Sequence, residues 1–347
     1  MGPDTRAILC NRSLLQARNS HFARMEALFA GETPASAFGL KGMVGKATAN
    51  PYSEPELWVE QALDDLAAQA DTLRDEFVFR PLVIEFGPYG VHFIDSLFGA
   101  HVFDLDGTAN WQARPLDRPV GSLQPPDLET HPTWRLARRV AMAFLEARVS
   151  LPLFGLPTIA SPLNIAVNLY GQEIFVAMLA DPEAAHRDLR VISDLLCTLH
   201  RWYREQIPFE QLQPVIAWER TQPPGFGQLC GCTTQLLSRG MYTEFIAPLD
   251  DELLSVYPNG GMIHLCGSHE QHISTWRQMG SLRAVQLNDR AAEDLPLYFD
   301  GLRDDQIMYV NPFERMPVER IMDITGGRRV VIPTDTELST TVQQDRS

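Results

Sequence analysis

The 347-residue chain has few cysteines, a deficit of basic residues and no long apolar run, and each shortage excludes a class of protein. Its five cysteines are an odd number and too few for a disulfide framework, so we expect free thiols in a reducing compartment. Because 29 Lys and Arg stand against 44 Asp and Glu, the net charge of −15 argues against a nucleic-acid or anionic-membrane partner. No apolar run approaches the roughly 20 residues of a membrane span. With no basic-then-apolar signal pattern at the N-terminus, the sequence predicts a cytoplasmic protein.

Several familiar catalytic motifs are also absent. Neither G-x-G-x-x-G nor G-x-x-x-x-G-K-[ST] follows an apolar run, so the chain has no nucleotide-binding fingerprint. The G-x-S-x-G elbow of hydrolases and the H-E-x-x-H pair of zinc proteases do not occur either. Any chemistry must therefore come from residues that are brought together by the fold.

Short apolar runs alternate with longer helical patterns over most of the chain. Runs that are apolar at nearly every position are typical of strands buried on both faces of a parallel sheet. Seven such runs occur, at 82–86, 157–160, 214–218, 262–266, 284–287, 307–310 and 329–332. Between them, helical spacing is found at 134–148, 163–206, 238–257, 270–279, 291–302 and 317–325.

This alternation predicts a (β/α)8 TIM barrel, with the remaining strand near 101–103 or 229–230. An open doubly wound sheet is the alternative, although the missing nucleotide fingerprint disfavours it. A helical pattern at 13–30, followed by a stretch rich in Gly, Ala and Thr, predicts that residues 1–50 form an N-terminal helical extension with a candidate lid at 31–51. Residues 51–347 are assigned to the barrel.

Polar residues stand at nearly every strand end, where the active site of a barrel forms. Glu85 and Asp289 are the candidate catalytic residues, since a carboxylate at a buried strand end should have a raised pKa that suits proton transfer. Polar strand ends can also simply meet water or form turns, which is the alternative interpretation. The candidate substrate-binding residues are Tyr89, His92, Asn288, Tyr309 and Asn311.

The sharpest pair is His264 and Cys266. Residues two apart on a strand point to the same side, so both side chains can enter the mouth of the barrel, and Gly267 allows a sharp turn after them. Imidazole nitrogen and thiolate sulfur are preferred ligands of zinc. Cys232 is the favoured third ligand. The open alternatives are that Cys230, His269 or Asp335 takes its place, or that the pair is an ordinary buried cysteine and histidine.

Several segments resemble the uroporphyrinogen decarboxylase superfamily, and the likeness extends from about residue 50 to 335. They include Glu85-Phe-Gly-Pro-Tyr-Gly, Ser161-Pro-Leu-Asn-Ile-Ala and Ile263-His-Leu-Cys-Gly. The last is similar to the H-x-C-G strand end that supplies two zinc ligands in the methyltransferase branch, whose members work with corrinoid proteins and thiols. The superfamily fold is a (β/α)8 barrel, which agrees with the strand pattern.

The chain departs from both branches of that superfamily. It lacks the arginine-rich M-R-Q-A-G-R-Y segment of the decarboxylases, and the turn after the last strand, Ile332-Pro-Thr-Asp-Thr-Glu, lacks the cysteine that usually completes the zinc site. The resemblance implies a zinc-dependent methyltransferase that moves a methyl group between a small methylated or methoxylated substrate, or a thiol, and a corrinoid protein. Because no D-x-H-x-x-G motif is present, the corrinoid would come from a separate protein. The alternatives are a metal-free decarboxylase or lyase, and a non-catalytic barrel that binds a metal or small ligand.

Overall fold

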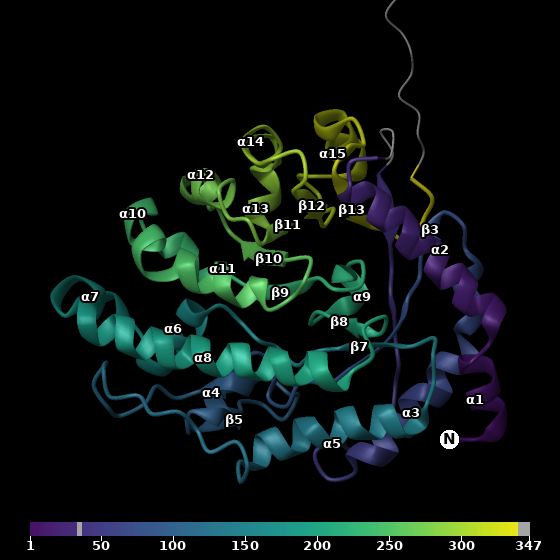
Figure 1. Ribbon diagram of the computed structural model, residues 1–347, viewed down its shortest axis with the longest axis horizontal. Helices are drawn as coiled ribbons and strands as arrows, with labels where there is room; N and C mark the ends of the chain where they lie inside the picture. The colour runs from purple at the N-terminus through teal and green to yellow at the C-terminus, as the bar shows by residue number, and fades with distance from the viewer. Residues whose placement is uncertain (33–36, 339–347) are drawn as a thin grey trace, which may run out of the picture.

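The computed structural model describes residues 1–32 and 37–338 and has parallel strands at its centre, with helices packed around them (Figure 1). One sheet has the order β3-β1-β13-β12-β11-β10-β9 and the other β2-β4-β7-β8. The first comprises β3 (Val78–Phe79), β1 (Phe38–Leu40), β13 (Val330–Pro333), β12 (Ile307–Val310), β11 (Leu282–Asn288), β10 (Gly261–Cys266) and β9 (Gly227–Cys230). The second comprises β2 (Met43–Val44), β4 (Leu82–Glu85), β7 (Leu153–Gly155) and β8 (Leu212–Gln213). The predicted α/β class with parallel strands is confirmed.

The two sheets are joined differently on their two sides. On one side, β1 and β2 are separated by only two residues, so a single segment pairs with β13 in one sheet and β4 in the other. On the other side, side chains bridge the gap between β8 and β9. Gln213 Nε2 donates to the carbonyl of Gln222 (2.9 Å), and Gln222 Nε2 donates to the carbonyl of Gly227 (2.8 Å). This order is consistent with a TIM-barrel-like fold, although no backbone ladder joins β8 to β9 in the described chain.

Most of the predicted strands are confirmed, and two are displaced. β4, β10, β11, β12 and β13 coincide with predicted runs to within about two residues. The strand predicted at 157–160 lies earlier, as β7, and that at 214–218 is replaced by β8 and the short helix α9 (Ala217–Arg220). Ile216 has φ 54°, a left-handed conformation that a strand cannot continue through. The unassigned strand at 229–230 is β9, whereas 101–103 belongs to an antiparallel hairpin of β5 (Val102–Asp104) and β6 (Trp111–Ala113).

Helices form at each predicted pattern, with breaks that the periodicity does not show. The pattern at 163–206 divides into α6 (Pro162–Tyr170), α7 (Glu173–Ala180) and α8 (Pro182–Gln206), because Gly171 has φ 61° and Pro182 opens a new helix. No single described helix is long and apolar enough to cross a membrane; α6 and α7 meet that criterion only together, with a bend of 109°. The remaining helical elements are α1 (Pro3–Leu9), α2 (Arg12–Phe29), α3 (Pro55–Ala68), η1 (Ala70–Arg74), η2 (Gly90–His92), α4 (Phe93–Leu97), α5 (Pro132–Ala147), η3 (Cys232–Leu236), α10 (Arg239–Met241), η4 (Tyr242–Ile246), α11 (Ala247–Ser255), η5 (Glu270–His272), α12 (Ile273–Trp276), α13 (Arg290–Glu293), α14 (Leu295–Gly301) and α15 (Val318–Thr325).

The Gly-, Ala- and Thr-rich stretch at 31–51, the candidate lid, contributes two short strands to the sheets, and its role as a lid stays a prediction. Its described part contains β1 and β2, and Phe38 and Leu40 are buried against β13 and β3. Strands of two or three residues are too short for an apolar period to reveal. Residues 33–36 of this stretch lie outside the described residues. The division of the chain at residue 50 stays a prediction.

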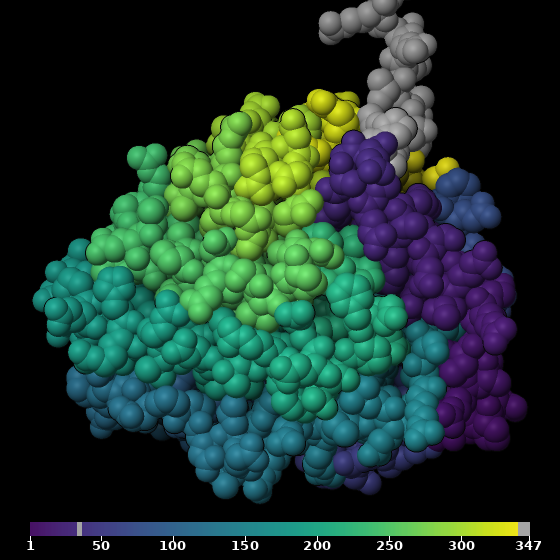
Figure 2. Space-filling model, viewed as in Figure 1, coloured from purple at the N-terminus to yellow at the C-terminus, as the bar shows by residue number. Residues whose placement is uncertain are grey.

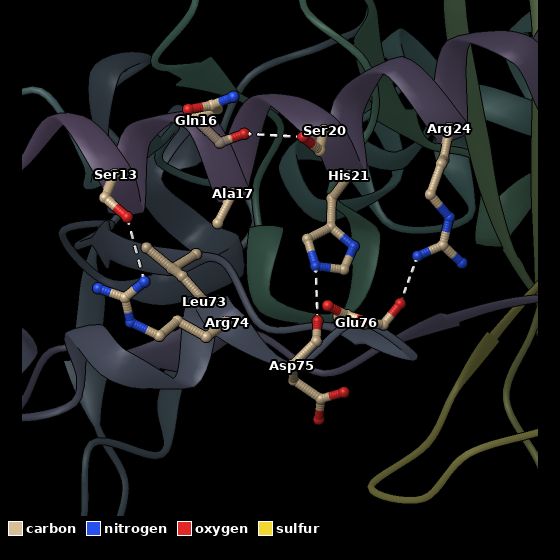
Figure 3. Close-up of a pocket in the computed structure, with 10 residues that line it drawn as sticks. All are labelled: Ser13, Gln16, Ala17, Ser20, His21, Arg24, Leu73, Arg74, Asp75 and Glu76. Atoms are coloured by element: carbon tan, nitrogen blue, oxygen red, sulfur yellow. Dashed lines mark hydrogen bonds between the residues drawn. The ribbon is translucent and has the colours of Figure 1, made fainter.

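The N-terminal helices lie along one side of the molecule, in purple in Figures 1 and 2. Between α2 and the segment before β3 lies a groove of about 580 Å³ (Figure 3). Hydrogen bonds from three side chains join the two walls of the groove. His21 Nε2 donates to the carbonyl of Asp75 (2.8 Å), Arg24 to the carbonyl of Glu76 (2.6 Å) and Arg74 to the Ser13 hydroxyl (3.1 Å). None of the predicted site residues lines this groove. These contacts hold α2 in place on the strand-bearing part of the chain.

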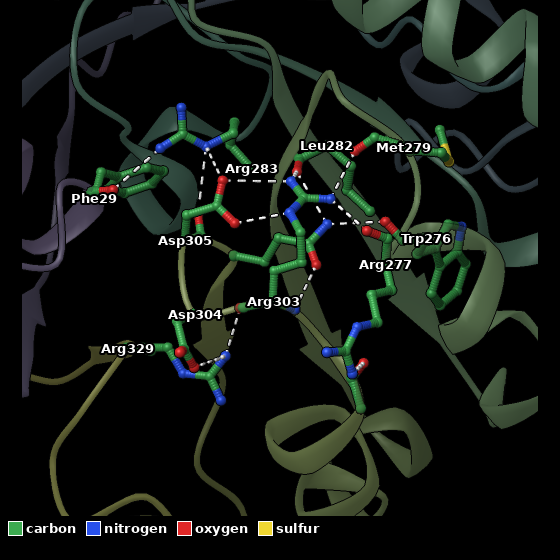
Figure 4. Close-up of polar contacts among 12 residues, drawn as sticks. Phe29, Trp276, Arg277, Met279, Leu282, Arg283, Arg303, Asp304, Asp305 and Arg329 are labelled. Carbon is green, nitrogen blue, oxygen red and sulfur yellow. Dashed lines mark hydrogen bonds and ion pairs between the residues drawn. The ribbon is translucent and has the colours of Figure 1, made fainter.

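A network of arginines ties together the loops that precede β11 and β12 (Figure 4). Arg303 donates to the carbonyls of Arg277 (2.6 Å), Met279 (2.9 Å) and Leu282 (3.1 Å) and pairs with Asp305 (2.8 Å). Its planar guanidinium can satisfy several acceptors at once, which a lysine cannot do. The network fixes where these two strands begin and hence where they end.

Replacing Arg303 by alanine is expected to lower the free energy of unfolding by about 2 to 3 kcal/mol, because carbonyls that are partly buried lose their donor. Urea unfolding of the purified variant measures this. The same substitution at the exposed Arg12 is the matched control, with an expected change within about 0.5 kcal/mol. Equal unfolding midpoints for the two variants would show that the network contributes nothing to stability.

Candidate metal centre

Three thiols and one imidazole gather where β9 and β10 end. The sheet register places Cys230 directly beside His264, and Cys266 follows two residues later on β10. The sulfurs of Cys230 and Cys232 are 3.4 Å apart, and Cys266 Sγ lies 3.2 Å from His264 Nε2. The ligand atoms of Cys230, Cys232 and His264 all lie within 4.8 Å of one another.

Two glycines make this gathering sterically feasible. The N–H of Gly231 donates to the carbonyl of His264 (2.9 Å), and a Cβ at Gly231 would lie 2.8 Å from Ile263 Cγ2. Gly267 has φ 77°, which confirms the predicted sharp turn after Cys266, and a Cβ there would collide with the Gln235 amide. Glycine at both positions lets the Cys230–Cys232 loop and the end of β10 approach closely.

The orientation of His264 leaves one ring nitrogen available to a metal. Its Nδ1 donates to Gln286 Oε1 at 2.7 Å, and Gln286 is completely buried on the neighbouring strand β11. The hydrogen therefore sits on Nδ1, and Nε2 presents its lone pair towards Cys266. Metal-binding histidines are usually held by such a contact to the other nitrogen.

The local electrostatics favour thiolate at two of the three cysteines. Hydrogen bonding from the Cys232 thiol lowers the pKa of Cys230 and of Cys266, and acting as donor raises the pKa of Cys232 itself. The buried guanidinium of Arg220 adds positive charge that lowers the pKa of Cys230 further. Thiolate is the form of cysteine that binds metals and attacks electrophiles.

The donor set fits zinc. Tetrahedral zinc with ligand bonds of about 2.0–2.3 Å holds neighbouring ligand atoms about 3.3–3.8 Å apart. The separations of 3.4 Å between two sulfurs and 3.2 Å between sulfur and nitrogen are close to that range. Sulfur and imidazole nitrogen are also the ligands that zinc prefers over calcium or magnesium.

The grouped ligands differ from the predicted set by one residue. Of the predicted ligands, His264 and Cys232 belong to the 4.8 Å group, whose third member is Cys230, an open alternative in the sequence. The predicted ligand Cys266 lies outside this group, although its sulfur is 3.2 Å from His264 Nε2. The other two alternatives make different contacts. Asp335 pairs with Lys41 and Arg80, and His269 is buried with its Nδ1 donating to the carbonyl of Gly267 (3.0 Å).

Glu85 ends β4 and has the raised pKa that was expected of it. Burial raises its pKa to about 7, opposed by the hydrogen bond from the Ala217 N–H (2.8 Å) and by the positive charge of Arg220. The positive charge of the buried Arg220 therefore acts on both the Glu85 carboxyl group and the thiols of the cluster. A group with this pKa can gain or lose a proton near neutral pH.

The predicted residues on β11 and β12 fall into two groups. Asn288 lies opposite Cys266 in the register and lowers the pKa of its thiol, and Asn311 Oδ1 accepts from Gln286 Nε2 at 3.3 Å. Both therefore belong to the surroundings of the cluster. Asp289 is exposed, with φ 48°. Tyr309 is fully buried, and its hydroxyl donates to the carbonyl of Thr221 (2.8 Å), as a core residue would.

Tyr89 and His92 lie on the segment that follows β4. Tyr89 packs against Tyr52 and Trp111, with ring centroids 5.5 and 5.0 Å away. His92 Nδ1 donates to the carboxylate of the fully buried Asp95 at 2.6 Å. Tyr89 therefore contacts aromatic rings, and His92 contacts a carboxylate.

Three residues that act on the cluster, by contact or by charge, were not among the predicted site residues. Arg220 and Gln286 are described above, and Asn164 of α6 places its Nδ2 3.7 Å from Cys230 Sγ while its Oδ1 accepts from the Thr233 N–H (3.2 Å). Gln286 could have been identified from the sequence, since it is a polar residue within an otherwise apolar strand. Asn164 and Arg220 each follow a strand end, but so do many residues with no such contact.

Comparison with known proteins supports the fold and leaves the family open. No protein-family model matches the sequence, and no curated protein matches it. Among solved structures, a methyltransferase from Methanosarcina mazei is similar with a TM-score of 0.61 and 13% identity, over 90% of this chain and 92% of that one. A B12-independent methionine synthase from Shewanella sp. W3-18-1, solved with selenomethionine, gives a TM-score of 0.43 and 10% identity, over 90% and 93%. The fold and the cluster therefore define a TIM-barrel-like α/β protein with a candidate Cys/His metal centre.

Proposed function

We propose that this protein is a zinc-dependent methyltransferase whose methyl acceptor or donor is a thiol. The observation that carries the proposal is the cluster of three thiols beside His264, whose Nε2 faces the Cys266 sulfur, at the carboxyl ends of parallel strands. The superfamily resemblance in the sequence points the same way. A fold shared with a protein named as a methyltransferase is compatible with it. We also infer that the strands close into a (β/α)8 barrel.

The main argument against methyl transfer is a missing zinc ligand, and the thiols of Cys230 and Cys232 can take its place. The chain has no cysteine after its last strand, where the methyltransferase branch usually carries a zinc ligand. In our proposal His264, Cys266 and Cys232 hold the ion together with Cys230, so the site keeps the sulfur-rich ligand set that thiol chemistry needs. The methyl group would be exchanged with a corrinoid carried by a separate protein.

The roles of the surrounding residues follow from their contacts. Zinc in this position supplies a Lewis acid that lowers the pKa of a substrate thiol. Glu85 receives or returns the thiol proton at its carboxyl group, since its pKa is about 7. Arg220 offsets the negative charge of the thiolates, and Asn288, opposite Cys266 in the register, favours the Cys266 thiolate. Asp289, Tyr89, His92, Tyr309 and Asn311 stay predicted catalytic or substrate-binding residues.

The test combines metal analysis with a transfer assay. We expect the purified protein to carry about one zinc per chain, the stoichiometry of a single mononuclear site. The zinc-loaded protein should methylate small thiols with free methylcobalamin as donor, and the chelated protein should not. Failure to bind zinc after reconstitution would exclude the proposal and favour a metal-free decarboxylase or lyase that uses Glu85. Zinc binding without transfer to any thiol would favour a non-catalytic metal-binding barrel.

A further inference from the structure

A chain of side-chain hydrogen bonds runs from His264 across two neighbouring strands to a carboxylate. His264 Nδ1 donates to Gln286 Oε1 (2.7 Å), and Gln286 Nε2 donates to Asn311 Oδ1 (3.3 Å). Asn311 Nδ2 in turn donates to Glu219 Oε2 (3.4 Å). The sheet register supports this path, since His264 lies opposite Gln286 and Asn311 is two residues beyond Tyr309, the partner of Gln286. His264 and Gln286 lie within strands, Asn311 directly follows β12, and Glu219 lies on α9.

The polarity of this chain is set at its carboxylate end. An ionised carboxylate can only accept hydrogen bonds, so it turns the Asn311 amide with its nitrogen towards Glu219. The Asn311 oxygen then faces Gln286 and turns that amide with its nitrogen towards Asn311. The Gln286 oxygen is left facing His264, which must donate from Nδ1.

Water cannot substitute for these partners at the histidine end. Gln286 is completely buried and His264 is 5% exposed. With the hydrogen on Nε2 instead, the Nδ1 lone pair would face the Gln286 oxygen at 2.7 Å, and two buried acceptors would lose their partners. The chain therefore favours the one tautomer whose Nε2 lone pair points to Cys266.

We propose that Glu219 is a positioning residue that fixes the tautomer of His264 through Asn311 and Gln286. Its carboxylate prepares Nε2 as a metal ligand without touching the metal or the substrate. The consequence for zinc affinity rests on the proposed function, whereas the tautomer is a property of the metal-free chain. A purely electrostatic effect of Glu219, through the adjacent Arg220, is the competing explanation.

The decisive variants separate the hydrogen-bond chain from the charge. E219A removes both the acceptor and its charge, N311A breaks the chain and keeps the charge, and E219Q keeps an oxygen acceptor and loses the charge. E205A, at an exposed glutamate on α8, is the matched control. Zinc affinity is measured by competition with a chelator, and the His264 tautomer by nitrogen-15 NMR of the metal-free protein, with the His264 signal identified by its loss in H264Q.

We expect E219A and N311A to bind zinc roughly 10- to 100-fold more weakly, the usual cost of losing an outer hydrogen-bond partner of a metal ligand. E219Q and E205A should stay close to the wild type. In the NMR spectrum, His264 should be an Nδ1–H tautomer in the wild type and a mixture of tautomers in E219A and N311A.

Two results would overturn the proposal. Weakened zinc binding in E219A and E219Q with normal binding in N311A would mean that the charge acts directly. An unchanged Nδ1–H tautomer in E219A and N311A would mean that Gln286 orients His264 without help. If the wild type binds no zinc, the proposed function fails, and the NMR comparison still decides the role of Glu219.

Discussion

Cys232→Ser is expected to weaken zinc binding by more than about 100-fold, beyond the cost of losing an outer-shell partner. The Cys232 sulfur lies 3.4 Å from that of Cys230, and hydrogen bonding from its thiol lowers the pKa of Cys266. A serine hydroxyl is not a soft ligand and does not ionise near neutral pH, so it cannot replace the thiolate. Zinc content and chelator competition measure the change.

Parallel variants define the complete ligand set. Cys230→Ser should behave like Cys232→Ser, because both thiols belong to the group within 4.8 Å of His264. Cys266→Ser decides whether the site has three or four protein ligands, since Cys266 touches His264 but lies outside that group. Cys10→Ser is the control, as Cys10 contacts the Arg148 carbonyl in a different part of the fold. Full zinc affinity in Cys232→Ser would contradict the proposed site.

Glu85→Gln is expected to stabilise the protein at pH 8 by about 2 to 3 kcal/mol relative to wild type. Burial raises the pKa of Glu85 to about 7 from its ordinary value of 4.5, so the fold favours the protonated form. The stability contributed by this group is therefore complete below pH 4.5 and is lost as pH rises through 7. Glutamine removes the ionisation and keeps an oxygen that can accept from the Ala217 N–H.

The measurement for Glu85 is urea unfolding of both proteins from pH 4 to pH 8. The difference in unfolding free energy should be small at pH 4 and should grow as Glu85 ionises. Glu205→Gln, at an exposed position, controls for the loss of one negative charge from the chain. A constant difference across this range would show that Glu85 is not held protonated. A stabilised variant that has lost methyl transfer would identify Glu85 as a residue kept for activity at a cost in stability.

Local features of the fold were predictable because strong periodic or spacing signals carry them. β10, with six consecutive buried or nearly buried residues, and β12, which matches the predicted run at both ends, are read directly from apolar runs. The alternation of side chains along a strand also predicted that His264 and Cys266 lie together. The short strands β1 and β2, of three and two residues, were not predicted. They are fixed by pairing with β13 and β4, which are distant in sequence.

The candidate site was predictable only in part, for a similar reason. Spacing could not choose among Cys230, Cys232, His269 and Asp335 as further ligands, because that choice depends on which strands are neighbours. The register of β9 against β10 places Cys230 beside His264, and the turn at Gly231 then brings Cys232 close. Gln286 and Glu219 matter through hydrogen bonds between residues distant in sequence, which carry no pattern along the chain.

The most direct test of the account is X-ray absorption at the zinc edge of the purified, zinc-loaded protein. The account predicts a mixed shell with sulfur at about 2.3 Å and nitrogen at about 2.0 Å, with at least two sulfurs per zinc. Adding a substrate thiol should increase the sulfur contribution. A shell of oxygen and nitrogen alone, or a protein that retains no zinc, would contradict the claim that these cysteines and His264 form a metal centre for thiol chemistry.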